Sequence, residues 1–96
     1  ADARDFEPLV PQLRMPRDLP VRFLFPQAPV RPVTINGHYR MRAWYDVYGF
    51  SGSAPEDAAG IAASTRRIHA LVDRELAAGV APERVIVAGF SQGGAM

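Results

Sequence analysis

A short apolar run leads directly into a glycine-rich turn near the end of this 96-residue chain. Residues 85–88 read Val-Ile-Val-Ala, and residues 89–93 follow without a break as Gly-Phe-Ser-Gln-Gly. An unbroken apolar run is typical of an interior strand of a parallel sheet, because both faces of such a strand are covered. Parallel strands are joined by crossover connections, so this feature predicts a buried strand over residues 84–88 within an α/β fold.

The other parts of a crossover unit lie upstream. Residues 21–25 (Val-Arg-Phe-Leu-Phe) predict a first buried strand, which ends at Pro26. Residues 55–78 predict the crossover helix, because aliphatic side chains recur there at helical spacing. That apolar stripe consists of Ile61, Ile68, Leu71, Val72 and Leu76.

Capping residues set the expected ends of the long helix. Ser53 with Glu56 fits a capping box at its start. Gly79 fits the residue that follows the C-cap, and Pro82 lies just beyond it.

Two smaller elements are expected before this helix. Asn36-Gly37 predicts a hairpin with strands over residues 33–35 and 38–41, since Asn-Gly tolerates the two positive φ angles of a type I′ turn. Residues 5–13 predict a short helix capped by Asp5. Seven of the nine prolines lie in the first third of the chain, which excludes a long helix there.

The turn at residues 89–93 fits the pattern G-x-S-x-G, in the strand-to-helix context that this pattern needs. In such an elbow a strained turn pushes the Ser Oγ away from its own backbone, so Ser91 is the candidate nucleophile. Gly89 and Gly93 allow backbone segments to approach without a Cβ clash. The backbone N–H of Gln92 is the candidate donor to a developing oxyanion.

Two other interpretations of the turn stay open. It can be a structural glycine-rich turn in which Ser91 caps the following helix. It can also be a phosphate cradle, although Gly89, Gly93 and Gly94 fit neither common phosphate-loop pattern and the chain has no Lys.

A serine nucleophile needs a histidine base that is oriented by a carboxylate. The chain holds only His38, expected at the hairpin turn, and His69, expected on the solvent face of the long helix. In hydrolases with a strand elbow the acid and the His follow the nucleophile, but the five residues after Ser91 include neither. Asp46 lies upstream and is out of that order.

The composition excludes several kinds of partner and site. Eleven Arg against ten Asp and Glu give a net charge of +1, without the clustered basic excess that nucleic-acid or anionic-membrane binding needs. No apolar run approaches the ~18 residues of a spanning helix, and no secretory signal is visible. Without Cys there is no disulfide, catalytic thiol or thiolate metal site, and nothing in the sequence implies a metal or cofactor.

Several stretches match one known family in order. They read Asp-Phe-Glu-Pro-Leu at 5–9, Phe-Pro-Gln-Ala-Pro at 25–29, Val-Thr-Ile-Asn-Gly at 33–37 and Trp-Tyr-Asp at 44–46. Together with residues 84–95 they resemble the phospholipase/carboxylesterase family, which includes bacterial carboxylesterases and acyl-protein thioesterases. The resemblance covers essentially the whole chain. It implies a partial α/β-hydrolase fold, with parallel strands, a crossover helix, an inserted β-hairpin and a nucleophile elbow.

The resemblance also implies roles for individual residues. Ser91 takes the nucleophile position, and the backbone N–H of Gln92 takes the position of one oxyanion donor. Trp44 falls in a segment that lines the acyl side of the family's cleft, although a buried core Trp is an equal alternative. Arg42-Ala43 stand where many members carry Pro-Ser, which leaves the substrate preference open.

The family domain is longer than this chain, so residues 1–96 are expected to be its central fragment, without the N-terminal oxyanion loop and the C-terminal acid and His. The implied activity is hydrolysis of carboxylic esters or thioesters through an acyl-enzyme on Ser91, with no cofactor and with the isolated chain inactive. Two alternatives are a non-catalytic α/β binding module and an obligate oligomer, and the oligomeric state stays open. With no signal peptide visible, a cytoplasmic protein is expected.

Overall fold

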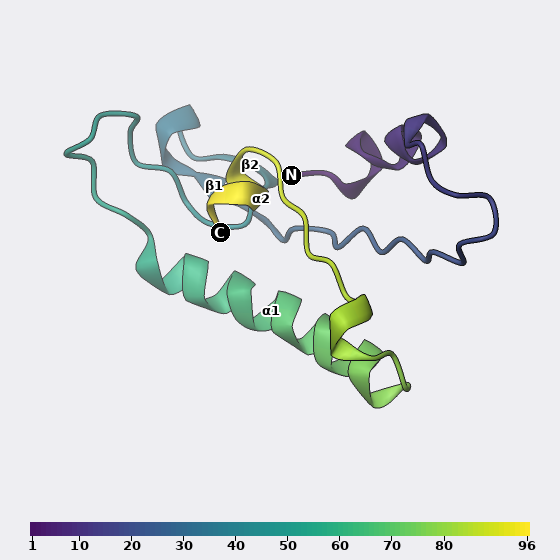
Figure 1. The fold of residues 1–96 in the computed structure, drawn as a ribbon. Coiled ribbons are helices and arrows are strands. Elements are labelled where there is room, and N and C mark those ends of the chain that lie inside the picture. The colour runs from purple at the N-terminus through teal and green to yellow at the C-terminus, as the bar shows by residue number, and fades with distance from the viewer.

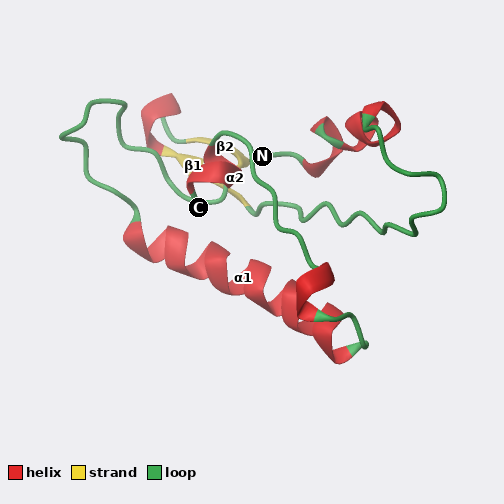
Figure 2. Ribbon diagram, viewed as in Figure 1, coloured by secondary structure: helices red, strands yellow, loops and turns green.

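The computed structural model describes residues 1–96, in which long loops connect a few regular elements (Figure 2). The main elements are the strands β1 (Val30–Val33) and β2 (Tyr39–Arg42) and the helices α1 (Ala58–Ala77) and α2 (Gln92–Ala95). Short 3₁₀ helices occur at Ala3–Asp5, Glu7–Gln12, Thr34–Asn36 and Pro82–Arg84. Figure 1 shows α1 along one side of the molecule, with the hairpin and α2 over its N-terminal half.

The predicted long helix is confirmed, but it begins three residues later than expected. Asp57 is its N-cap, and one carboxylate oxygen of Asp57 accepts the Gly60 N–H at 3.0 Å. The expected Ser53–Glu56 capping box is wrong, because the Ser53 hydroxyl bonds to the Ser51 hydroxyl instead. A carboxylate at the N-cap satisfies a backbone donor that the first helical turn leaves unpaired, so Asp57 sets the start of α1.

The C-terminal end of α1 is formed as predicted. Gly79 has a φ of 101°, and its N–H donates to the Leu76 carbonyl at 3.1 Å. The next N–H, of Val80, reaches back to the Glu75 carbonyl at 3.1 Å. This pair of bonds is a Schellman motif, which needs a left-handed residue and therefore favours Gly.

The predicted hairpin is confirmed with a different turn. β1 and β2 pair antiparallel from Val30 opposite Arg42 to Val33 opposite Tyr39. β1 begins three residues earlier than expected and β2 one residue later, and residues 34–38 form a five-residue connection instead of a two-residue type I′ turn. The positive φ angles fall on Gly37 (63°) and His38 (61°), one residue later than the Asn-Gly pattern indicated.

The N-terminal segment forms two 3₁₀ helices, Ala3–Asp5 and Glu7–Gln12, where one short helix over 5–13 was expected. Pro8 and Pro11 have no N–H to donate to a preceding turn, which prevents a regular α-helix here. Asp2, not Asp5, is the cap, since its carboxylate accepts the Arg4 N–H at 2.9 Å. The same carboxylate pairs with the Arg4 guanidinium, which holds the pKa of Asp2 well below its usual range.

The two predicted buried strands, 21–25 and 84–88, do not form strands within this chain. Residues 21–25 carry no regular structure, and residues 82–84 form a 3₁₀ turn from which an extended segment runs to Ser91 (Figure 1). A strand is stabilised by a ladder of hydrogen bonds to a neighbour, and neither segment finds such a neighbour here. Most of their apolar side chains are consequently exposed, and Ile86 is 91% accessible.

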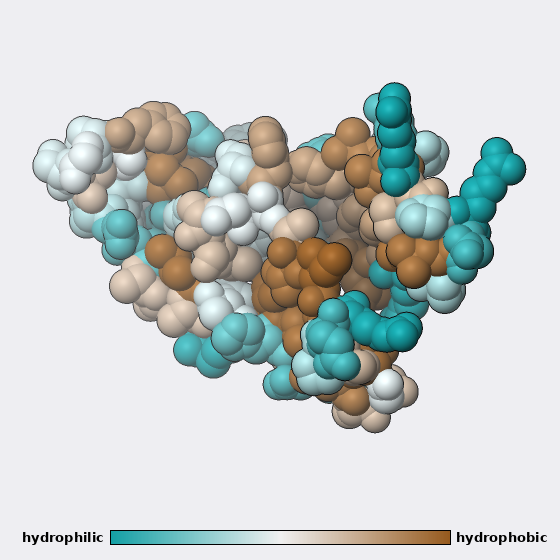
Figure 3. All heavy atoms as spheres, viewed as in Figure 1, coloured by the Kyte–Doolittle hydropathy of each residue, from teal (hydrophilic) through white to brown (hydrophobic).

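The core is small and lies between the hairpin and α1. Only six of the 96 residues are buried, and they are Ala28, Val33, Ala43, Trp44, Gly60 and Ser64. The chain exposes 7456 Å², whereas a compact chain of 10.5 kDa exposes about 5,400 Å². The structure is therefore open, and apolar side chains gather on its surface over the middle of the view in Figure 3. No helix in it combines the length and apolar character needed to cross a bilayer.

Candidate functional site

Ser91 has a backbone conformation that is unusual for a residue with a side chain. Its φ is 53° and its ψ is −120°, and it stands between the extended segment that follows Arg84 and the start of α2. Such a conformation costs on the order of 1–3 kcal/mol and persists only where the surroundings enforce it. The turn is enforced in part by close packing at Gly89, where a Cβ would collide with the carbonyl group of Gly93 and lie 2.8 Å from the Gly94 nitrogen.

The polar groups at the tip of this elbow are unpaired. The Ser91 side chain makes no capping hydrogen bond to α2. The structural alternative in which Ser91 caps this helix is therefore wrong. The backbone N–H of Gln92 also has no acceptor within the chain, whereas the N–H groups of Gly94 and Ala95 donate to the Ser91 carbonyl at 3.0 Å. A hydroxyl and a neighbouring free backbone donor are therefore presented together.

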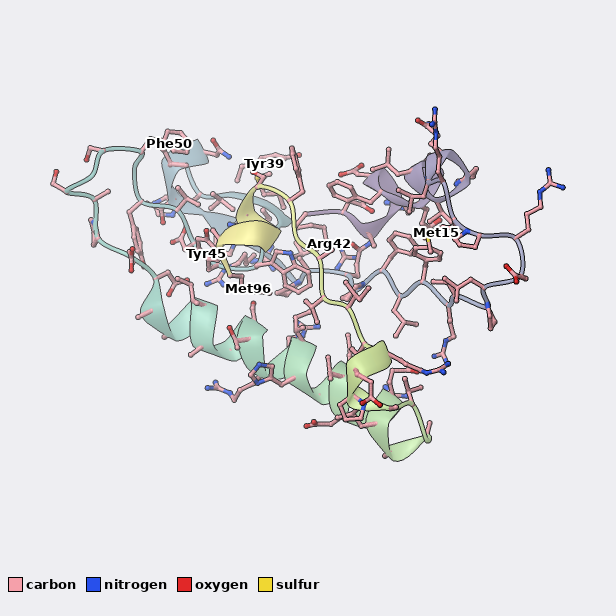
Figure 4. All side chains as sticks on the ribbon, in the orientation of Figure 1. Met15, Tyr39, Arg42, Tyr45, Phe50 and Met96 are labelled. Atoms are coloured by element: carbon pink, nitrogen blue, oxygen red, sulfur yellow. The ribbon has the colours of Figure 1, made fainter.

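The side chain of Gln92 bonds to a distant part of the chain. Its Oε1 accepts the backbone N–H of Trp44 at 2.8 Å, and its Nε2 donates to the Tyr45 carbonyl at 3.0 Å. Figure 4 shows Tyr45 beside the short helix α2. These two bonds join the elbow to the segment that follows the hairpin.

The backbone of Trp44 is also held by α1, through its carbonyl group. The Trp44 carbonyl accepts the hydroxyl of the buried Ser64 and lies 3.5 Å from a guanidinium nitrogen of Arg31. Arg31 also donates to the Asp57 carboxylate at 3.1 Å. The elbow, the hairpin and α1 are thus connected through one residue.

Two carboxylates stabilise this connection. Asp46 accepts the hydroxyl of Thr34 at 2.6 Å and its N–H at 2.8 Å, and these bonds lower the pKa of Asp46. Asp57 accepts the Asp46 N–H at 2.8 Å, and this bond, with the Gly60 N–H and the Arg31 guanidinium, lowers the pKa of Asp57. Hydrogen bonds to the charged form of a carboxyl group favour that form.

We expect the stability of the protein to fall in acid because of these carboxylates. A group whose pKa is depressed in the folded state stabilises it above the unfolded-state value of about 3.9, and that contribution is lost as the pH falls through the folded-state pKa. Urea unfolding should show Asp57→Asn to be less stable than wild type at pH 7, with the difference shrinking below about pH 4. Asp18→Asn, at an exposed position without hydrogen-bond partners, is the control. A pH-independent difference for Asp57→Asn would contradict this assignment.

The two histidines are not at the elbow. His38 lies in the exposed hairpin connection and His69 on the exposed face of α1, as expected, and neither bonds to Ser91. Asp46 is occupied by Thr34 in the hairpin, so it orients no histidine. No group of three or more His, Asp or Glu side chains comes together in a metal-binding arrangement.

Trp44 is a buried residue that also borders a groove. It is 8% accessible, and it lines a groove against α1 with Pro26, Gln27, Ile68 and Leu71 among others. A second hollow, of about 180 Å³, lies between the hairpin and residues 43–50 and includes Gln92 and Phe50 in its lining.

The network around the Trp44 peptide was not predicted from the sequence. Gln92 was expected to contribute only its backbone N–H, and Ser64, Arg31 and Asp57 had no assigned role. One signal was available for Asp57, because an Asp three residues before Gly60 at the start of an apolar-periodic segment is typical of an N-cap. The long-range bonds carried no comparable signal, because they join residues 13 to 48 positions apart.

Comparison with known proteins gives consistent relatives. The model of the phospholipase/carboxylesterase family matches residues 12–96. Acyl-protein thioesterase 1 of Schizosaccharomyces pombe is 45% identical over 73 residues, which cover 76% of this chain and 33% of that protein. Carboxylesterase SOBER1 of Arabidopsis thaliana is 38% identical over 92 residues, which cover 94% of this chain and 40% of that protein. The chain thus spans well under half the length of these curated relatives.

The fold agrees with a solved member. The crystal structure of Arabidopsis thaliana SOBER1 superposes with a TM-score of 0.90 at 36% identity, over 99% of this chain and 46% of that one. Its L63A variant superposes equally well. The predicted partial α/β-hydrolase fold is therefore confirmed, although the sheet within these residues is only the antiparallel pair of β1 and β2. With a family match over residues 12–96, the chain belongs to the phospholipase/carboxylesterase family.

Proposed function

We propose that residues 1–96 are the central part of a serine hydrolase domain that cleaves carboxylic esters or thioesters. Ser91 Oγ attacks the acyl carbonyl and forms an acyl-enzyme, which water then hydrolyses. The backbone N–H of Gln92 donates to the oxyanion, and the histidine base and its acid lie on other parts of the full-length protein. Acyl-protein thioesterase 1 and carboxylesterase SOBER1, by their names, act on these two classes of acyl bond.

The observation that carries this proposal is the conformation of Ser91. Ser91 is not a glycine, yet it has a strained φ of 53°, and its hydroxyl makes no capping bond. No interaction within the chain explains this conformation as a stabilising one. It does present the Oγ beside a free backbone donor, which is the arrangement that acyl transfer needs. The alternative, a non-catalytic module with a structural Gly-Ser turn, accounts for Gly89 but not for a Ser at a position whose φ of 53° would favour Gly.

Covalent labelling distinguishes the two functions. The full-length protein is treated with a fluorophosphonate, which reacts with activated serines, and its peptides are mapped by mass spectrometry. We expect a single adduct on Ser91, because only an Oγ with a positioned base is nucleophilic enough to react. Ser53, an exposed loop serine, should stay unmodified in the same digest. A protein that binds no probe at Ser91 would favour the non-catalytic module.

A further inference from the structure

The Gln92 side chain, which acyl transfer does not itself require, makes two of the longest-range hydrogen bonds of the chain. The candidate oxyanion donor is the backbone N–H of Gln92, and any residue except Pro supplies that N–H. The side chain points away from this role and bonds to the peptides of Trp44 and Tyr45, 48 and 47 positions upstream. These bonds are the polar tie between the elbow and the rest of the structure.

The tie ends on a peptide that is itself immobilised. Trp44 is buried, and its carbonyl accepts the hydroxyl of Ser64, which is 2% accessible. Ser64 lies within the 20-residue helix α1, the longest rigid element of the chain. Hydrogen bonds therefore connect α1 to the Trp44 carbonyl, and the Trp44 N–H to the Gln92 side chain.

Few other contacts hold the elbow in place. The segment that leads into it has no sheet partner here, and Phe90 is 74% accessible, with one tilted ring contact to Phe6 at 5.9 Å. Within residues 1–96, the hydrogen bonds that join the strained turn to a distant part of the chain come from the Gln92 side chain.

We propose that the Gln92 side chain is a positioning residue, which, with Ser64, locks the elbow to the Trp44 peptide so that Ser91 Oγ and the Gln92 N–H keep a reactive geometry. This inference rests on the proposed hydrolase function. The clamp acts on the rate of acyl transfer and not on substrate binding, because both polar atoms of the Gln92 side chain bond to backbone groups of the protein. Misplacing a reacting group by about 1 Å costs on the order of 100-fold in rate.

The test compares variants of the full-length protein in p-nitrophenyl butyrate hydrolysis. Gln92→Met keeps the length of the side chain and the backbone N–H but loses both hydrogen bonds. We expect kcat to fall by about 10- to 100-fold with KM unchanged, since the lost geometry matters only in the transition state. Gln12→Met, a substitution of the same type at an exposed position without hydrogen bonds, should keep wild-type kcat and KM.

Ser64→Ala tests the clamp from its other end, because it removes the α1 hydroxyl from the Trp44 carbonyl, leaving only the longer Arg31 contact, without altering the elbow. We expect a smaller fall in kcat, and the double variant Gln92→Met/Ser64→Ala should fall by less than the product of the two single effects, as for residues that act as a unit. Hydrogen exchange of the peptide that contains residues 89–96 should accelerate in both single variants while the melting temperature changes little. If Gln92→Met unfolds, Gln92→Glu replaces it, since it keeps the acceptor for the Trp44 N–H and turns the bond to the Tyr45 carbonyl into a repulsive contact between two oxygens.

Three results would overturn the clamp. They are wild-type kcat in Gln92→Met, a raised KM with unchanged kcat, and multiplicative effects in the double variant. Each leaves the proposed function intact as long as Ser91→Ala is inactive. If Ser91→Ala instead keeps wild-type turnover, the hydrolase function itself fails, so the two failures are distinguishable.

Discussion

Replacing Ser91 with Ala is expected to lower kcat for p-nitrophenyl butyrate by on the order of 10⁴- to 10⁶-fold in the full-length protein, because triad members act as a unit and the nucleophile is lost. The elbow should keep its shape, since Ala tolerates the backbone geometry no worse than Ser does. Far-UV circular dichroism and the melting temperature should therefore stay near the wild-type values. Initial rates over a range of substrate concentrations measure the effect.

A matched serine gives the control. Ser53→Ala changes an exposed loop hydroxyl that bonds only to Ser51, so its kcat should equal the wild-type value. The isolated 96-residue chain should show no turnover above background, because neither His38 nor His69 reaches Ser91. Ser91-dependent turnover by the isolated chain would contradict this and return His38 to consideration as the base.

Replacing Trp44 with Ala is expected to destabilise the protein by about 3–5 kcal/mol, the usual cost of removing a large aromatic side chain from a core. Trp44 is 8% accessible in a chain that buries only six residues, so little else compensates for the cavity. Urea unfolding at pH 7 measures the change in the free energy of unfolding. Trp44→Phe should cost less, because part of the ring packing is kept.

An exposed aromatic residue serves as the control, because it shows whether the loss of stability comes from burial or from removing an aromatic side chain as such. Phe50 is 88% accessible, so Phe50→Ala should change the free energy of unfolding by no more than about 0.5 kcal/mol. If Trp44→Ala were as stable as wild type but altered the preference among acyl chain lengths, Trp44 would be a substrate-pocket residue instead of a core residue. The two interpretations of Trp44 that the sequence left open are thereby resolved by one measurement of stability and one of specificity.

Local signals in the sequence predicted the elements that depend on local interactions. The apolar stripe from Ile61 to Leu76 predicted α1, and Gly79 predicted its end, because helical bonds and the Schellman motif join residues at most five apart. The Asn-Gly pair predicted the hairpin for the same reason. The prediction was wrong where two local arrangements were possible. At the start of α1 the N-cap is Asp57, and the Ser53–Glu56 capping box does not form.

The predicted strands over 21–25 and 84–88 failed for a different reason. Their composition is typical of buried strands, but a strand exists only with a hydrogen-bonded neighbour, and its formation depends on the tertiary context. Ile86 and Val87 are exposed because the sheet within this chain has only two strands, and neither of them pairs with this segment. The superposition on SOBER1 shows that the path of the chain is nonetheless that of the α/β-hydrolase fold.

The sequence alone determined the long helix, the hairpin, the family and the candidate elbow at Ser91, because each depends on a contiguous pattern of residue types. Only the tertiary structure revealed that Gln92, Ser64, Arg31 and Asp57 converge on the Trp44 peptide. The physical reason is that a hydrogen bond between residues far apart in the chain forms only when the fold brings donor and acceptor together. The residues near either partner do not show where the other partner will lie. The elbow was therefore visible in the sequence, whereas the clamp that we propose holds it was not.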